Sequence, residues 1–185
     1  MFRQYVITVT ETTTSRDGQC SHICDKRYVN GVKGDMLELD CVAYKTFDMC
    51  TDAESFIEQL PVSRSWAAGK YINTYVYNVE AIDYTHANFH GYSDKQPYEI
   101  VRVISPRTLE VRLLDAELDP TWKPETVKGG FSGYTVNNHQ QKWLYNTNAK
   151  NDTVRIRRRK DGYYYSSIGR HALATAPSKF HDYNF

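Results

Sequence analysis

Long apolar stretches are missing from this chain of 185 residues. No segment approaches the roughly 18 consecutive apolar residues that a transmembrane helix needs. The first ten residues also lack the basic start and apolar run of a secretory signal. The sequence therefore predicts neither a membrane span nor export. Its content of 41% hydrophobic and 24% charged residues matches ordinary globular domains and excludes a disordered chain.

Cysteine is scarce, with Cys20, Cys24, Cys41 and Cys50 only. In a chain without a secretory signal, such cysteines are typical of reduced thiols in the cytosol. Structural zinc favours cysteine pairs separated by two to four residues, because that turn points both thiolates at one ion. Cys20, His22 and Cys24 form the compact candidate set, whereas Cys41 and Cys50 lie too far apart to form a second pair. We therefore predict no metal site and no cofactor, with that set as the alternative.

The familiar catalytic and phosphate-binding signatures are missing as well. The chain contains no Gly-x-Ser-x-Gly and no Gly-x-Gly-x-x-Gly, and Gly69-Lys70 lacks the other residues of a Walker loop. The remaining candidates for acid–base catalysis are His86, His90 and Asp94, which are close together in the sequence. They support one alternative, an enzyme acting on nucleic acid or nucleotides. The missing motifs favour a protein that is not an enzyme.

A net charge of +1 hides a division along the chain. Residues 1–92 hold 8 Lys and Arg against 12 Asp and Glu, whereas residues 93–185 hold 15 against 10. The first part thus carries −4 and the second +5. Such asymmetry is typical of a basic functional surface in one half. The alternative is that both halves pack into one globule, in which their opposite electrostatic fields would partly cancel.

Most of the chain has the side-chain alternation of β-strands. Runs rich in β-branched and aromatic residues predict strands over 2–10, 36–44, 70–84, 98–104, 108–114, 142–145, 153–158 and 163–166. The Lys160-Asp161-Gly162 step predicts a hairpin between the last two. We expect a long loop or a short hairpin over 11–34, a loop over 86–96 and an irregular connection over 115–133.

One helix is expected, from Asp52 to Leu60. Thr51 and Glu54 have the spacing of a capping box, and Pro61 would end the helix. Its apolar face would consist of Ala53, Phe56, Ile57 and Leu60. The predicted fold class is therefore α+β, mainly antiparallel β with one short helix (about 52–60) and a β-rich, barrel-like C-terminal half. An acidic α+β half (1–84) and a basic β-rich half (97–185) are expected, either as two domains or as one continuous domain.

Several short motifs of the second half recur in one class of proteins. They are Tyr92-Ser93-Asp94, the strand pair 97–101 and 104–111, the Arg159-Lys160-Asp161-Gly162 hairpin and the aromatic end Phe180-His181-Asp182-Tyr183-Asn184-Phe185. With these motifs, roughly residues 90–185 resemble small uncharacterised proteins encoded by bacteriophages and other mobile elements. The resemblance implies an accessory phage protein in the cytoplasm of a bacterial host. It implies no reaction and no catalytic residues.

The sharpest chemical feature is the basic, aromatic stretch 155–165. On a strand, Arg155, Arg157 and Arg159 would share one face. Guanidinium groups bind phosphate oxygens, and tyrosine rings stack on bases. We predict a ligand- or phosphate-binding surface that consists of Arg155, Arg157, Arg158, Arg159, Lys160, Tyr163 and Tyr165. The alternative is a solvated edge strand whose charge prevents pairing with another chain.

A second candidate lies in the irregular connection, where Trp122 and Lys123 precede Gly129 and Gly130. Glycines permit hinge motion and close backbone approach, so these residues are candidates for a lid or a ligand-gripping loop. The alternative is a surface loop that Trp122 pins in a pocket.

Together, these features predict a phage accessory protein that binds, and inhibits or sequesters, a host defence or regulatory component or a nucleotide signal. Its partner would be a host protein or a nucleotide or nucleic-acid ligand, with no role for a membrane. Two alternatives stay open. One is the enzyme described above, and the other is a protein–protein inhibitor that uses the acidic N-terminal half. The sequence leaves the oligomeric state undetermined.

Overall fold

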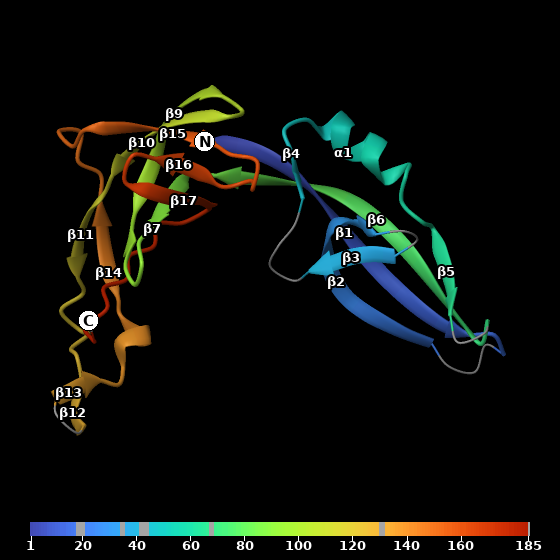
Figure 1. Ribbon diagram of the computed structural model, residues 1–185, viewed down its shortest axis with the longest axis horizontal. Helices are drawn as coiled ribbons and strands as arrows, with labels where there is room; N and C mark the ends of the chain where they lie inside the picture. The colour runs from blue at the N-terminus through green and yellow to red at the C-terminus, as the bar shows by residue number, and fades with distance from the viewer. Residues whose placement is uncertain (18–20, 34–35, 41–44, 67–68, 130–131, 185) are drawn as a thin grey trace. The chain divides into compact units, whose positions relative to one another are not determined.

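The computed structural model describes residues 1–17, 21–33, 36–40, 45–66, 69–129 and 132–184 (Figure 1). The chain divides into two compact units, one of residues Arg3–Ile82 and the other of Asp83–Phe185 together with Met1–Phe2. Within the described ranges, no helix is long and apolar enough to cross a membrane.

The Arg3–Ile82 unit is built on an antiparallel sheet in the order β3-β2-β1-β6-β5, with β4 paired to β1. The strands are β1 (Phe2–Ser15), β2 (Ser21–Lys33), β3 (Met36–Asp40), β4 (Thr46–Phe47), β5 (Ser63–Trp66) and β6 (Tyr71–Tyr84). Within 11–34, where we expected a long loop or a short hairpin, residues 11–15 instead continue β1 and residues 21–33 form β2. The turn residues in this stretch therefore led us to predict a shorter hairpin than the one that β1 and β2 form.

Helix α1 (Cys50–Ile57) packs on this sheet (Figure 1). It begins earlier than predicted, at N-cap Met49, and no side chain caps it. The predicted capping box is therefore wrong, and the Glu54 carboxylate instead accepts a hydrogen bond from Cys50 Sγ at 3.5 Å. The predicted apolar face does meet the core, in which Ala53 and Leu60 are buried with Ile7, Val9 and Val29.

The other unit contains a closed, antiparallel six-stranded barrel in the order β7-β9-β10-β15-β16-β17 (Figure 1). These strands are β7 (His86–His90), β9 (Tyr98–Ser105), β10 (Thr108–Leu113), β15 (Thr153–Arg158), β16 (Tyr164–Ser166) and β17 (Gly169–Ala174). Pairing of β17 with β7 closes the barrel, and β8 (Lys95–Gln96) extends β7 on its other side. The predicted fold class, with a barrel-like C-terminal half, is confirmed.

The predicted loop over 86–96 is wrong, because β7 and β8 occupy most of it. The irregular connection also contains strands, since β11 (Asp115–Leu118) pairs with β14 (Trp143–Asn146). Within this insertion, β12 (Thr126–Gly129) and β13 (Ser132–Thr135) form a hairpin, followed by the 3-10 helix η1 (Asn138–Gln140). The β11–β14 pairing joins segments that lie far apart in the sequence, whereas β12 and β13 are sequence neighbours.

Side chains from successive barrel strands fill the interior, where Leu109, Ile156, Tyr164 and His171 are almost fully buried. The Tyr164 hydroxyl donates to the Pro106 carbonyl at 2.7 Å. The His171 ring lies 2.9 Å from the Ser166 hydroxyl and edge-on to Tyr98. Burial lowers the pKa of His171, so the barrel favours a neutral imidazole at this position.

Candidate nucleic-acid interface

Strand β15 sorts the predicted arginines onto two faces. Ile156 is fully buried, whereas its neighbours Arg155 and Arg157 are exposed. Successive residues of a strand point to opposite faces, so Arg158 lies on the inner face with Ile156. Arg158 is half-buried and pairs in register with buried Tyr164. The sequence pattern thus places Arg155 and Arg157 correctly, but Arg158 does not belong to the same surface.

Five side chains on neighbouring strands form one register row on the outside of the barrel. Arg157 of β15 is opposite Tyr165 of β16, which is opposite Arg170 of β17. Arg170 is in turn opposite His90 of β7, and His90 is opposite Lys95 of β8. We call these five residues the basic row. Its four strand-to-strand steps, each about 4.8 Å, make it roughly 19 Å long.

The cations of the basic row, Arg157, Arg170 and Lys95, are exposed and form no ion pair among the residues that the structure describes. Exposed cations that form no ion pair leave a positive potential over the surface. The basic row can therefore accept several anionic groups along its length.

Two guanidinium groups stack on tyrosine rings beside the row. The Arg159 guanidinium lies 4.0 Å from the ring centre of Tyr165, and that of Arg170 lies 4.7 Å from the ring centre of Tyr163. Arg159 follows the end of β15, and its amide donates to the Tyr163 carbonyl. Arg159, Tyr163 and Tyr165 of the hairpin and Arg170 of β17 therefore form one group of stacked arginines and tyrosines, which suits stacking and phosphate contact.

One acidic residue, Asp161, adjoins this group. Its carboxylate accepts hydrogen bonds from the Tyr165 hydroxyl at 2.7 Å and from the Tyr163 amide at 3.1 Å. The bond from Tyr165 lowers the pKa of Asp161, and the same bond raises the pKa of Tyr165. Asp161 thus fixes the Tyr165 ring from the hairpin turn, where Gly162 takes up a positive φ of 85°. Lys160 is exposed in the same turn.

The neighbouring row on the same barrel surface has a different composition. Glu110 of β10 lies between Arg102 of β9 and Arg155 of β15 in register. Its carboxylate is 3.1 Å from Arg102 Nε and 4.0 Å from Arg155 Nε. We call these three residues the paired row. Arg155, predicted to bind phosphate, therefore has a carboxylate partner within the protein.

His90 adds a titratable group to the basic row. Burial lowers its pKa, and the positive charges of Lys95 and Arg170 lower it further. His90 is therefore largely neutral near pH 7, and an anion bound beside it would favour its protonated form.

The three candidates for acid–base catalysis are not brought together. His86 and His90 stand at opposite ends of β7, about 13 Å apart along the strand. His86 Nδ1 lies 2.8 Å from the Thr85 hydroxyl, and burial lowers its pKa. Asp94 lies beside His181, with 3.6 Å between its Oδ2 and His181 Nδ1. The arrangement offers no shared acid–base centre for His86, His90 and Asp94.

The candidate metal set lies outside the description, because Cys20 and the side chains of His22 and Cys24 are not among the described groups. In the part of the chain that the structure does describe, no three His, Cys, Asp or Glu side chains gather in a way that would hold a metal ion.

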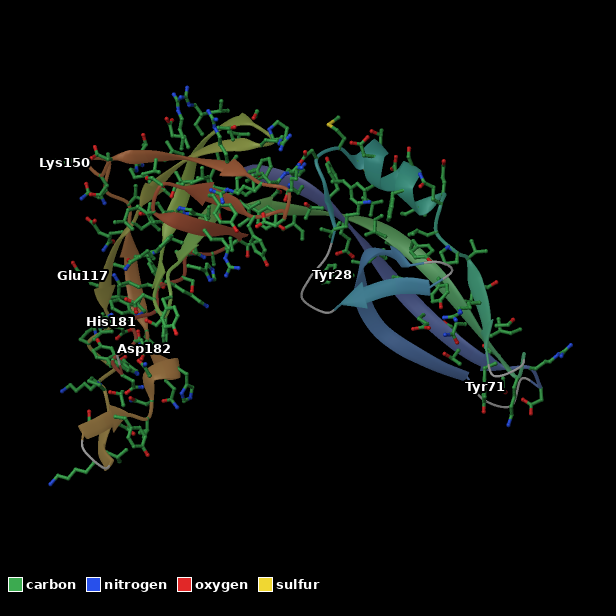
Figure 2. The ribbon with its side chains drawn as sticks, in the orientation of Figure 1. Tyr28, Tyr71, Glu117, Lys150, His181 and Asp182 are labelled. Atoms are coloured by element: carbon green, nitrogen blue, oxygen red, sulfur yellow. The ribbon has the colours of Figure 1, made fainter. Side chains whose placement is uncertain are left out.

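The Trp122 loop is held by the C-terminal segment. Trp122 is buried, and its ring centre lies 5.6 Å from that of Tyr183. The same segment contains His181 and Asp182 (Figure 2). It is fixed by two hydrogen bonds, since Asn138 Nδ2 donates to Asp182 Oδ1 at 2.8 Å and the His181 amide donates to Gln141 Oε1. Trp122 is thus packed as the anchoring alternative requires.

The remaining residues of the candidate lid have separate positions. Lys123 lines a pocket of about 380 Å³ beside Trp122. Gly129 belongs to β12 and pairs with Ser132, while Gly130 lies outside the described residues. The pocket wall is braced by Asn137, whose side chain bonds to the backbone of Lys123 and Glu125.

Comparison with known protein families, curated proteins and solved structures finds no match to this chain. Its function is therefore inferred from the geometry of the site. Sequence reasoning missed Arg170 and Lys95, and it named His90 only as a candidate for acid–base catalysis. The available signal was the alternation over 169–174, which would have predicted β17 and an outward Arg170.

Proposed function

We propose that this protein is a non-enzymatic binding protein that sequesters a phosphate-bearing nucleotide ligand on the outside of its barrel. The basic row is the single observation that carries the proposal. It combines an aromatic ring with three exposed cations that form no ion pair with any described residue, and two stacked arginine–tyrosine pairs lie in or beside it. Phosphate contact and aromatic stacking are two interactions by which proteins hold nucleotides and single strands.

The resemblance of residues 90–185 to phage and mobile-element proteins adds an expectation about context. In a bacterial host, such a ligand would be a host nucleic acid or a nucleotide signal of a defence or regulatory system. Sequestration needs affinity and no turnover, which agrees with the separation of His86 from His90 on β7.

Fluorescence anisotropy with labelled phosphate-bearing probes tests the proposal. The probes are a cyclic dinucleotide, an oligothymidylate and an oligouridylate, each at about 50 mM and about 200 mM salt. We expect binding of at least one probe that weakens with salt and is lost in Arg157→Gln/Arg170→Gln.

Arg102→Gln is the matched control, because it removes one exposed charge from the same barrel surface but from the paired row. It should bind within about twofold of the wild type, since Arg102 is already paired with Glu110. If the wild-type protein binds none of the probes at low salt, the proposal is wrong.

A further inference from the structure

The basic row is long, and it follows the outer surface of the barrel. Its five residues come from β15, β16, β17, β7 and β8. Neither the pocket beside Trp122 nor a second one lined by Arg16 and Lys70 contains a residue of this row. A small ligand gains affinity chiefly by being enclosed in a concave pocket, whereas an open row of cations suits an extended chain of phosphates.

The charges recur at a regular interval along this row. Arg157 and Arg170 are separated by Tyr165, and Arg170 and Lys95 are separated by His90. Each pair of cations is thus two strand spacings apart, or about 10 Å. One nucleotide carries only one phosphate group in a polymer, so several nucleotides are needed to reach all three cations.

Tyr163 offers the surface for a base. It is 44% exposed, and the Arg170 guanidinium rests 4.7 Å from its ring centre. A ring held by a guanidinium and still open to solvent can stack on a base at little cost in conformational entropy. In a double helix the base faces are stacked on one another and are closed to such contact.

We infer that the ligand of this surface is an unpaired nucleic-acid strand that crosses the barrel strands along the basic row, with a base stacked on Tyr163. This inference rests on the proposed function and names the ligand class. Phosphates lie against Arg157, Arg170 and Lys95, and the Arg159–Tyr165 pair borders the path.

The test measures binding of thymidine oligonucleotides from one nucleotide to about 12, and of a duplex of the longest length. Affinity should rise over the first several nucleotides, then level off once the row is filled. The duplex should bind at least tenfold more weakly than the single strand. Tyr163→Leu should weaken single-strand binding roughly tenfold, which corresponds to the loss of one base stack.

Three controls separate stacking from charge. Tyr163→Phe keeps the ring and should bind as the wild type does. Tyr134→Leu removes an exposed tyrosine from β13, outside the barrel sheet, and should have no effect. Inorganic polyphosphate has no bases, so its binding should be the same for the wild type and Tyr163→Leu.

The outcomes also separate this inference from the proposed function. Equal affinity for single strand and duplex, or tight binding of a single nucleotide, would overturn the inference alone. The same holds if Tyr163→Leu leaves single-strand binding unchanged while Arg157→Gln/Arg170→Gln abolishes it. Absence of binding by any phosphate-bearing probe would overturn both. Far-ultraviolet circular dichroism verifies that each variant is folded.

Discussion

Two neighbouring rows on the outside of the barrel differ in the residue that lies between two arginines. In the paired row, Glu110 lies between Arg102 and Arg155, so that one carboxylate serves two guanidinium groups. In the basic row, Tyr165 occupies the position between two arginines, Arg157 and Arg170.

Exposed ion pairs stabilise a fold by only about 0.2–1 kcal/mol, so the central carboxylate of the paired row matters little for folding. Its main consequence is electrostatic, because it neutralises positive potential that would otherwise attract an anion. Tyr165, between Arg157 and Arg170, carries no charge itself and supplies a ring for stacking, while its hydroxyl binds the Asp161 carboxylate at the hairpin turn. The difference between the rows therefore concerns binding more than stability.

The largest effect should come from making the basic row resemble the paired row. Tyr165→Glu would place a carboxylate between Arg157 and Arg170 and would remove the ring that Arg159 covers. We expect single-strand affinity to fall roughly 100-fold, because charge neutralisation and loss of the aromatic surface act together. Anisotropy titrations at about 50 mM salt measure the change.

Tyr165→Gln separates these two causes, since it removes the ring without adding charge. Its affinity should lie between those of the wild type and Tyr165→Glu. Equal affinities for the two variants would show that the central charge is irrelevant, and the contrast between the rows would then have no electrostatic basis.

The reverse change should have a smaller effect. Glu110→Gln would leave Arg102 and Arg155 without their carboxylate and would create a second positive row beside the first. We expect affinity to rise roughly three- to tenfold at low salt. The slope of log K against log salt should become steeper by about 0.7 for each additional phosphate that is contacted. The melting temperature should change little.

An unchanged salt slope in Glu110→Gln would mean that the ligand does not extend to the paired row. Thr153→Gln, at an exposed β15 position two residues before Arg155, is a control for a glutamine on the same surface and should leave both slope and affinity unchanged.

Part of this surface can be predicted from the sequence, because strand alternation and hairpin turns depend on residues that are close together in the chain. Alternation around Ile156 predicts that Arg155 and Arg157 share a face, and Asp161-Gly162 predicts the hairpin that brings Arg157 beside Tyr165. Helix α1 is also predicted, since its apolar residues recur at helical spacing. The predicted start of the helix is wrong, because an N-cap depends on local backbone geometry that residue types do not determine.

The rest of the surface depends on pairings between distant segments. His90 joins the row because β7 pairs with β17, about 80 residues away, and this pairing is set by closure of the barrel. Gly91 and the polar residues around it favour a loop on local criteria, so tertiary structure overrides the local preference there. The neutralisation of Arg155 is equally non-local, since Glu110 belongs to β10. Long-range strand register therefore determines that Arg155 meets a carboxylate, whereas Arg157 forms no ion pair among the described residues.

The smallest effect should come from pH, through His90. Burial and the charges of Lys95 and Arg170 hold its pKa below 6.5 in the protein without ligand, so it gains a proton only as the pH falls below that value. A bound phosphate favours the protonated ring, and binding therefore takes up a proton. We expect single-strand affinity to rise roughly threefold between about pH 7.5 and about pH 5.5, and His90→Gln should remove most of this rise.

Acidification should raise ligand affinity through His90 but lower folding stability through His171. His171 therefore sets the lowest pH at which the binding experiment can be done. Its pKa is also lowered in the barrel, chiefly by burial, so the unfolded chain binds more protons once the pH falls below about 6.5. Unfolding free energy should therefore decrease as the medium is acidified, in the wild type and in His90→Gln alike. Thermal melts at each pH identify the range in which both proteins stay folded. Within that range, an equal rise of affinity in both proteins would assign the pH dependence to a group other than His90, and the basic row would then act through its permanent charges alone.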